Sequence, residues 1–499
     1  MPEPAISAEQ YSNLVRERVA ALRRLLLDLT RKAPQSAPHR FFSAVRILID
    51  AVERVFSSRC KAIESQPGSK EERATETAFA ARWTMELLNN AQAQFFPFLE
   101  KLDSPHVPLW MLPAMQRIAS QFEPNVELYL FPTSEHNFGF SGFRDLLRAF
   151  VQKFELAIPD DLKVEIEERA AKLPQWFVFL SFPYVVHDSA LHLTPLLHEL
   201  GHFADFRLGI YKELLPIDIS QSDAARKVVE EICQMRVPMG APESKIEGAQ
   251  QPGVEPRVEE ILQRDVIEQQ VFALCGQIIR NWVHELISDL FAVRMGGPAY
   301  FYSFATFAAN LRLDARAGAS HPSPSMRIDL MLKELSDLHY SSEYSPLQVR
   351  SSLESWRRWL ETQPLEPEEP PTRVAYWAIK ENESKLVEAV RKHTSAFSYG
   401  TRAYTEKVKY VVNDLEAGIP PIDRAGDGEA AFDACDLVDI LNGAWTTYMF
   451  SPEKLESLIE CPPPERKLRG VSVLNELVQK AIEASEILRQ CHKRSKGGV

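Results

Sequence analysis

The sequence lacks the features that mark several specialised classes of protein. Its six cysteines are scattered and none forms a Cys-x-x-Cys pair, which argues against a disulfide framework or a zinc ribbon and favours a reducing compartment. The first residues, Met1-Pro2-Glu3-Pro4, show no basic region followed by an apolar stretch, so no signal peptide is expected. The most apolar short segment, Trp176 to Val186, is shorter than the about 20 residues that a membrane span needs. We therefore expect a cytoplasmic protein without a membrane span.

The chain also has fewer basic than acidic side chains. The chain carries 57 Lys and Arg against 69 Asp and Glu, a net charge of -12, whereas nucleic-acid binding needs a basic surface. The short basic run from Lys493 to Lys496 is expected to be a solvated end. We therefore expect no nucleic-acid partner. With 499 residues, of which 45% are hydrophobic, the chain can bury a sizeable core without disulfides.

Apolar residues recur at helical spacing in the N-terminal third. This pattern predicts helices over Ala8–Lys32, Phe41–Glu64 and Lys70–Phe95, with a turn at Gln66–Ser69. After Ser320 the chain again reads as mostly helical. The predicted division of the chain is an N-terminal helical region (1–123), a central domain (124–335) and a C-terminal helical region (336–499).

The texture of the sequence changes near residue 124. Val126–Phe131 and Trp176–Phe182 are rich in β-forming residues, and each is followed by a proline. Between them, Gly139–Gly142 is predicted to be a turn and Phe143–Leu156 a helix. The two strand-like segments predict a small sheet.

The run His198-Glu199-Leu200-Gly201-His202 lies in a predicted helix. Two histidines four residues apart project from the same face and can hold one metal ion. Glu199 is turned about 100° around the helix from His198, which lets its carboxylate reach a water molecule on that metal. Zinc acidifies such a water, and the glutamate takes its proton as the water attacks a carbonyl. The run therefore predicts a zinc ion held by His198 and His202, with Glu199 as the general base.

A catalytic zinc ion needs a third protein ligand, and a second predicted helix, Val266–Met295, offers one. Glu285 and Asp289 lie four residues apart among apolar neighbours on this helix. Buried carboxylates are costly unless they are paired or bind a metal. We expect Glu285 to be the third ligand and Asp289 to accept a hydrogen bond from a ligand histidine, which holds the histidine ring.

His198-Glu199-x-x-His202 followed by Glu285-x-x-x-Asp289 resembles the gluzincin group of zinc metallopeptidases. In that group a glutamate on a second helix is the third ligand, and an aspartate one turn later supports a ligand histidine. The metzincin pattern does not fit, because it needs glycine and histidine at positions where this chain has Asp205 and Leu208.

The resemblance covers roughly residues 176–330. It implies a zincin-like core with a small β-sheet, zinc as the cofactor and the hydrolysis of peptide bonds. The fold class expected is mainly α (α+β), with this core flanked by the N- and C-terminal helical regions. The stretch between the two predicted helices is long, which fits an insertion near 213–268.

A further segment, Ser320 to Ile328, contains His321 and Arg327. Some gluzincin-like peptidases have a similar His-Pro…Arg-Ile segment, and a late histidine or arginine can stabilise the oxyanion of a tetrahedral intermediate. His321 and Arg327 are therefore candidate catalytic residues. The alternative is a loop shaped by prolines, with Arg327 capping the next helix.

Other residues near the motif are weaker candidates. His187 and His192 precede it, but neither has a spacing that competes for the zinc ion. Asp205, one turn after His202, either holds a ligand ring or faces solvent.

The second predicted helix and its neighbour also carry residues with a structural interpretation. His284 points about 100° away from Glu285 on the helix, so a structural role is expected. Tyr300 and Tyr302 are expected in the core rather than in a cleft.

Two other functions remain open at the level of sequence. One is a helical scaffold or interaction protein with a structural or degenerate zinc site, although a structural site has no use for Glu199. The other is a zinc hydrolase of non-peptide amides, which would need a closed, small pocket.

The partners expected are a peptide or protein substrate and a regulatory protein that binds the helical flanks. The loop Pro238–Pro256 is a lid, an ordered insertion or disorder.

Overall fold

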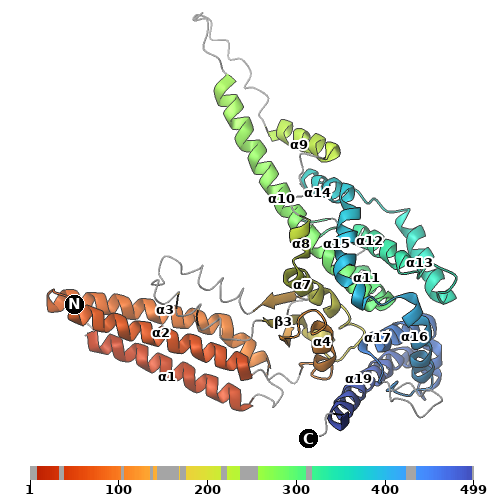
Figure 1. The fold of residues 1–499 in the computed structure, drawn as a ribbon, viewed down its shortest axis with the longest axis horizontal. Coiled ribbons are helices and arrows are strands. Elements are labelled where there is room, and N and C mark those ends of the chain that lie inside the picture. Colours follow the sequence, from red (N-terminus) through yellow and green to blue (C-terminus); the bar gives the residue numbers. More distant parts are fainter. Residues whose placement is uncertain are drawn as a thin grey trace, which may run out of the picture. The chain divides into compact units, whose positions relative to one another are not determined.

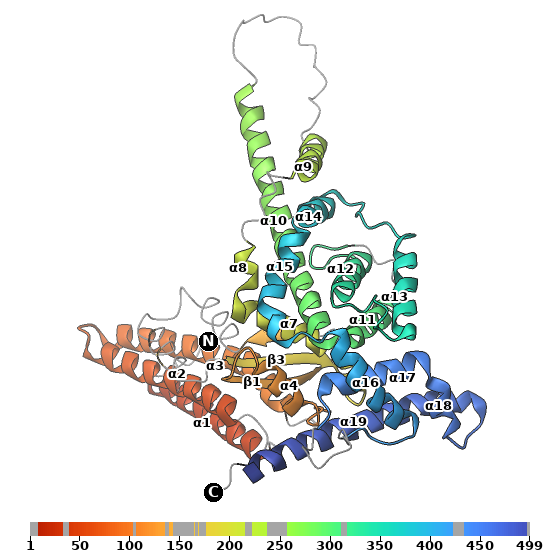
Figure 2. The same cartoon turned by 45° about the vertical axis from the view of Figure 1, so that its right-hand side comes forward.

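The computed structural model describes eleven stretches of the chain: 8–32, 39–102, 106–134, 139–142, 164, 168, 176–214, 222–236, 257–310, 317–422 and 434–496. Over these residues the protein is mainly helical with one small sheet (Figures 1 and 2). The chain divides into two compact units, Met1–Asp188 and Ser189–Val499. The predicted helix Phe143–Leu156 and the loop Pro238–Pro256 lie outside the described residues. No helix in the described stretches is both long and apolar enough to cross a bilayer.

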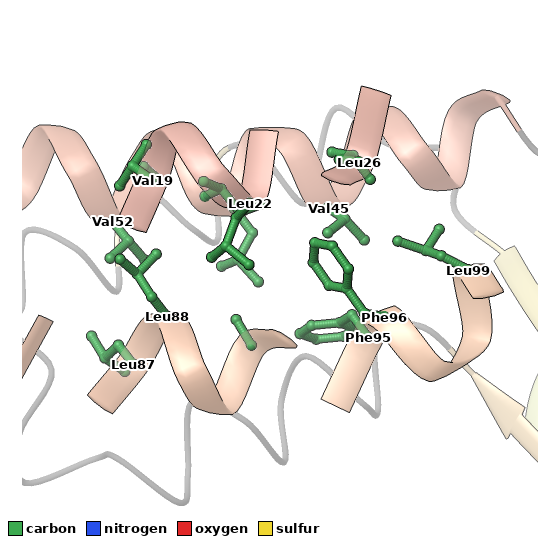
Figure 3. Packing of buried hydrophobic residues seen from close by; sticks show 14 of the residues in the cluster. Val19, Leu22, Leu26, Val45, Val52, Leu87, Leu88, Phe95, Phe96 and Leu99 are labelled. Carbon is green, nitrogen blue, oxygen red and sulfur yellow. The ribbon is translucent and has the colours of Figure 1, made fainter. Parts of the chain in front are cut away.

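The first unit contains three long helices, α1 (Ala8–Lys32), α2 (His39–Ser65) and α3 (Lys70–Leu102), each of which packs against the other two. Their buried apolar side chains meet along the shared axis (Figure 3). The three helices predicted in this region are confirmed, and α3 runs further than predicted. At its start, the Ser69 side chain accepts from the Glu72 N–H (3.1 Å) and the Glu72 carboxylate accepts from the Ser69 N–H (2.8 Å). This reciprocal cap explains why the helix begins there.

The sheet has three strands, β1 (Val126–Thr133), β2 (Gly139–Gly142) and β3 (Trp176–Pro183), in the order β1-β3-β2. β1 pairs parallel to β3 and β2 pairs antiparallel to it, while α4 (Leu112–Ala119) packs on β1. The two predicted strands are confirmed. The turn predicted at Gly139–Gly142 is wrong, because those residues form β2. Glycine has low strand propensity, but here the β3 backbone supplies the partner, and a Cβ at Gly139 would lie 2.7 Å from Ser181 Oγ.

The second unit is built around α10 (Arg257–Gly296), which packs against α7 (Leu196–Leu208), α9 (Asp223–Arg236) and α11 (Pro298–Asn310). Figure 2 shows α10 running along this unit with helices on several sides. The remaining helices are α8 (Ile210–Glu213), α12 (Pro324–Asp337), α13 (Leu347–Leu360), α14 (Pro370–Glu381), α15 (Glu383–Thr394), α16 (Thr401–Glu416), α17 (Leu437–Phe450), α18 (Pro452–Ser457) and α19 (Pro463–Lys496). Short 3-10 turns lie at Tyr184–Val186 (η1, in the first unit) and Ser395–Phe397 (η3).

The contact between α7 and α10 is a backbone contact at one glycine. A Cβ placed on Gly201 would lie 2.7 Å from the Cα of Ser288 and 2.8 Å from its carbonyl oxygen. No side chain fits at that distance, so glycine is required for the two helices to approach this closely. Gly201 stands between the two histidines of α7, and Ser288 stands between Glu285 and Asp289 on α10. The contact therefore brings the two groups of candidate residues together.

The joint between α10 and α11 is held by α17. Gly297 adopts a left-handed conformation (φ 59°) that lets the chain turn sharply. The Asn442 side chain accepts from the Ala299 N–H (2.9 Å) and donates to the Gly296 carbonyl (2.8 Å), all of them buried. This pair of bonds satisfies the backbone groups freed at the helix ends.

Candidate metal centre

Three side chains converge where α7 meets α10. One ligand atom each from His198, His202 and Glu285 lie within 4.8 Å of one another. The Nε2 of His198 is 3.4 Å from Oε2 of Glu285, and the Nε2 of His202 is 3.4 Å from Oε1 of the same carboxylate. Within the described stretches, this is the one group of three or more His, Cys, Asp or Glu side chains that could hold a metal ion.

The spacing of these atoms fits a zinc ion. Zinc binds nitrogen and oxygen at about 2.0–2.2 Å, so two ligands at a tetrahedral angle lie roughly 3.4 Å apart. Each histidine Nε2 lies at this separation, 3.4 Å, from a different oxygen of the Glu285 carboxylate. Two imidazole nitrogens and one carboxylate oxygen are also the donor set of many catalytic zinc sites, which keep a fourth position for water or substrate.

The second ring nitrogen of His198, Nδ1, contacts a buried carboxylate and a buried hydroxyl. This nitrogen lies 3.0 Å from Oδ1 of Asp289, a fully buried carboxylate. The hydroxyl of Tyr300 donates to the same Oδ1 (2.6 Å) and lies 3.2 Å from Nδ1 of His198. When Nδ1–H donates to Asp289, Nε2 carries the lone pair that faces Glu285. This is the contact by which proteins orient a metal-binding histidine.

Arg327, on α12, binds the same carboxylates. Its Nε donates to Oδ2 of Asp289 (2.6 Å) and one terminal nitrogen donates to Oδ1 (2.7 Å). The other terminal nitrogen lies 3.4 Å from Oε2 of Glu285, and the guanidinium stands 4.5 Å from the centre of the Phe304 ring. The N–H groups that an oxyanion would need thus face two carboxylates of the protein. Arg327 does not cap α12, because the Ser323 side chain accepts from Met326 N–H and makes the cap.

His321 lies at the exposed edge of the site. Its Nε2 is 3.7 Å from Oε1 of Glu285, and its Nδ1 is 2.8 Å from the Ser320 hydroxyl. The side chain is 52% exposed, whereas that of Glu285 is 13% exposed. His321 therefore stands beside the ligand group, on the side that solvent reaches.

Glu199 is buried, with 5% of its surface exposed. Burial raises the pKa of its carboxyl, while the histidines at positions 198 and 202 oppose that change. A carboxylate whose pKa is raised toward neutrality is suited to accept and return a proton.

The pKa values of the residues in and next to the ligand group depend on one another. Burial by itself lowers the pKa of the His198 imidazole, but hydrogen bonds to Asp289 and Glu285 outweigh burial and raise it to about 10. Burial raises the pKa of Glu285, but its bonds to His198 and His202 outweigh burial and hold that pKa far below its usual range. Arg327 likewise lowers the pKa of Asp289 against the effect of burial.

The buried charges also favour a divalent cation. Three carboxylates, those of Glu199, Glu285 and Asp289, stand against the single fixed positive charge of Arg327. Buried charges are costly unless they are balanced. Without a metal, a proton on His198 offsets only part of this negative charge, whereas a divalent ion that displaces the proton would offset all of it.

The sequence predicts that Tyr300 lies in the core and indicates no role for its hydroxyl. Its ring is buried, as expected, but the hydroxyl binds Asp289. The spacing along the chain carries no signal for this contact, because the turn at Gly297 between α10 and α11 creates it.

Asp205 has a role that neither sequence interpretation foresaw. Its buried carboxylate accepts from the Tyr211 N–H (2.7 Å) through Oδ1 and lies 2.6 Å from Nδ1 of His284 through Oδ2. It thus ties the end of α7 to α8 and α10. The structural role expected for His284 fits this contact, since the ring also lies against Tyr211.

Comparison of the chain with protein-family models, with curated proteins and with solved structures finds no match.

Proposed function

We propose that this protein is a zinc-dependent metallopeptidase of the gluzincin type, with a zincin-like core. The observation that carries the proposal is the convergence of His198, His202 and Glu285 at the spacing of zinc ligands. Glu199, buried on the same helix as the two histidines, supplies the base that such a reaction needs.

In this mechanism His198, His202 and Glu285 hold the zinc ion. A zinc ion held there would supply an acidified water molecule and Lewis-acid polarisation of the scissile carbonyl. Glu199 accepts the proton of the attacking water and passes it to the leaving amine.

The surrounding residues divide into two roles. His321 lies at the exposed edge and is the candidate donor to the developing oxyanion. Arg327 and Asp289 act from the buried side by orienting His198 and balancing charge. Arg327 thus acts through the ligands rather than on the substrate.

The donor set favours an enzyme over a scaffold. Structural zinc sites are closed by four protein ligands, whereas three converge here and an exposed histidine stands beside them. A structural site also has no need of a buried carboxylate at Glu199. A zinc hydrolase of non-peptide amides uses the same residues, so substrate assays decide between the two.

The test is zinc content and peptide cleavage measured on the same preparations. We expect about one zinc per chain in the parent protein and in Glu199→Gln, and loss of zinc from His202→Ala and Glu285→Ala. Cleavage of a mixed peptide library should disappear in all three variants. His192→Ala is the matched control, because this exposed histidine lies outside the ligand group, and it should retain both zinc and activity.

Each other outcome points elsewhere. A parent protein that takes up no zinc, even after the metal is added back, would end the proposal. Zinc with hydrolysis of small acyl amides but not of peptides would assign the second class of substrate. Zinc that Glu285→Ala retains would remove Glu285 from the ligands, and zinc without hydrolysis of either class would leave a structural site.

A further inference from the structure

A second group of histidines lies in the first unit, apart from the ligands already described. The short turn η1 brings Tyr184 and His187 to the same side, and His106 meets them from the segment before α4. The Nδ1 of His106 is 3.3 Å from the Nε2 of His187.

We propose that His106 and His187 bind a divalent transition-metal ion between these two nitrogens. The site does not depend on the proposed peptidase activity, since it shares no residue with His198, His202 and Glu285.

The spacing of the pair is that of two ligands of one ion. Nitrogens bound to one tetrahedral zinc lie roughly 3.3 Å apart, which is the separation of His106 Nδ1 and His187 Nε2. The two rings have centroids 4.7 Å apart and planes at 88°. The rings of His198 and His202 have the same separation and the same angle, 4.7 Å and 88°.

The outer nitrogens have the partners that metal-binding histidines use. The Nδ1 of His187 is 3.0 Å from the Tyr184 carbonyl, which can only accept, so Nδ1–H donates and Nε2 carries a lone pair. The Nε2 of His106 is 3.4 Å from the Tyr184 hydroxyl. When this nitrogen donates, Nδ1 also carries a lone pair. Two lone pairs then face each other, and a cation between them removes their repulsion.

The donors select the class of ion. Imidazole suits Zn²⁺, Ni²⁺ and Cu²⁺, whereas Mg²⁺ and Ca²⁺ require oxygen ligands. Tyr184 is 45% exposed and both histidines are partly exposed, so an ion and its waters can reach the pair. With two protein ligands among the residues that the structure describes, this site should bind more weakly than the ligand group of His198.

The experiment is a titration of the full-length protein, already loaded with zinc, with Ni²⁺ followed by isothermal calorimetry. We expect one further equivalent in the parent protein, no response to Mg²⁺, and loss of this equivalent in His106→Gln and in His187→Gln. Glutamine keeps a polar side chain of similar reach, and thermal melting of each variant shows whether it is folded. His192→Ala is the control and should bind as the parent does.

The competing arrangement is one proton shared between the two rings as an N–H···N hydrogen bond. In that case Ni²⁺ uptake would be the same, within a factor of about two, in the parent and in folded His106→Gln and His187→Gln, and the proposal would be overturned. His202→Ala separates the two sites. It should lose the tightly bound zinc and keep the Ni²⁺ equivalent, so failure of one proposal is distinguishable from failure of the other.

Discussion

At the scale of single residues, His198 is the side chain that connects the candidate metal centre to the buried Asp289. Its Nδ1 is held by Asp289 and its Nε2 faces Glu285, so both ring nitrogens point at carboxylates. Without a metal, this arrangement stabilises the protonated ring. A zinc ion and a proton therefore compete for Nε2.

This competition predicts that zinc binding depends on pH. The pKa of His198 is raised to about 10 by its carboxylate partners, so below that pH the metal-free ring is protonated and must lose a proton to bind zinc. Zinc affinity should therefore rise with pH, by up to about tenfold per unit, and level off above the pKa. Chelator competition between about pH 6 and about pH 9, corrected for the chelator's own protonation, measures the slope. A flat profile would contradict the coupling of His198 to Asp289 and Glu285.

Arg327 gives a second prediction at this scale. Since it binds Asp289 through two N–H groups, Arg327→Met should weaken zinc binding by about 10–100-fold, and Arg327→Lys by less. Added zinc should restore much of the hydrolysis. If Arg327 stabilised the oxyanion instead, zinc affinity would stay at the parent value while kcat fell at saturating zinc. Arg402→Met, at an exposed arginine of α16, serves as the control.

At the scale of helices and strands, the crossing of α7 and α10 depends on Gly201, because this residue has no side chain. The ligands of the candidate centre come from these two helices, and the Gly201–Ser288 contact sets how closely they approach. A methyl group at this point pushes the helices apart and moves Glu285 away from His198 and His202.

We therefore expect Gly201→Ala to weaken zinc binding at least tenfold and to lower the free energy of unfolding by about 1–3 kcal/mol, as overpacked cores do. Gly276→Ala on α10 is the matched control, because a Cβ there meets no atom within 4 Å. That change should leave zinc binding intact and add up to about 1 kcal/mol of stability from helix propensity. Equal zinc affinity in the two variants would show that the crossing does not position the ligands.

The helices and strands also show which parts of the fold can be predicted from residue spacing. Helical periodicity located α1 and α2 to within two residues and the start of α3, although α3 continues from Phe95 to Leu102, and β-forming side chains located β1 and β3. A helix is predicted over Leu191–Leu208, but α7 begins only at Leu196, because residues 190–195 form turns. β2 escaped prediction because its glycines and serine carry no strand signal, and only its pairing with β3 makes it a strand.

At the scale of the whole molecule, every residue of the candidate metal centre belongs to the unit Ser189–Val499. Helices late in the chain support it. Asn442 on α17 bonds the α10–α11 joint, and Trp445 of the same helix donates to Thr194 (3.2 Å) just before α7. The C-terminal helices are thus part of the framework that holds the ligands.

It follows that a protein spanning 189–499 should fold cooperatively and bind about one zinc ion by itself. A shorter protein ending at residue 422, which lacks α17, should lose that zinc, because the joint next to Tyr300 is then unsupported. Zinc content and thermal melting of the two proteins provide the measurement. A folded 189–499 protein without zinc affinity would show that the centre needs residues of the first unit.

The sequence by itself determined the local features of this protein, namely the helices, two of the three strands and the placing of His198, Glu199 and His202 on one helix. These follow from residue spacing, which acts over a few turns of chain. Only the tertiary structure decided that Glu285 meets the two histidines, that Tyr300 and Arg327 bind Asp289, and that α17 braces the joint. Such contacts join residues distant in sequence. They depend on how closely the helices pack. Gly201 permits the close approach of α7 and α10, and residue spacing along the chain does not predict it.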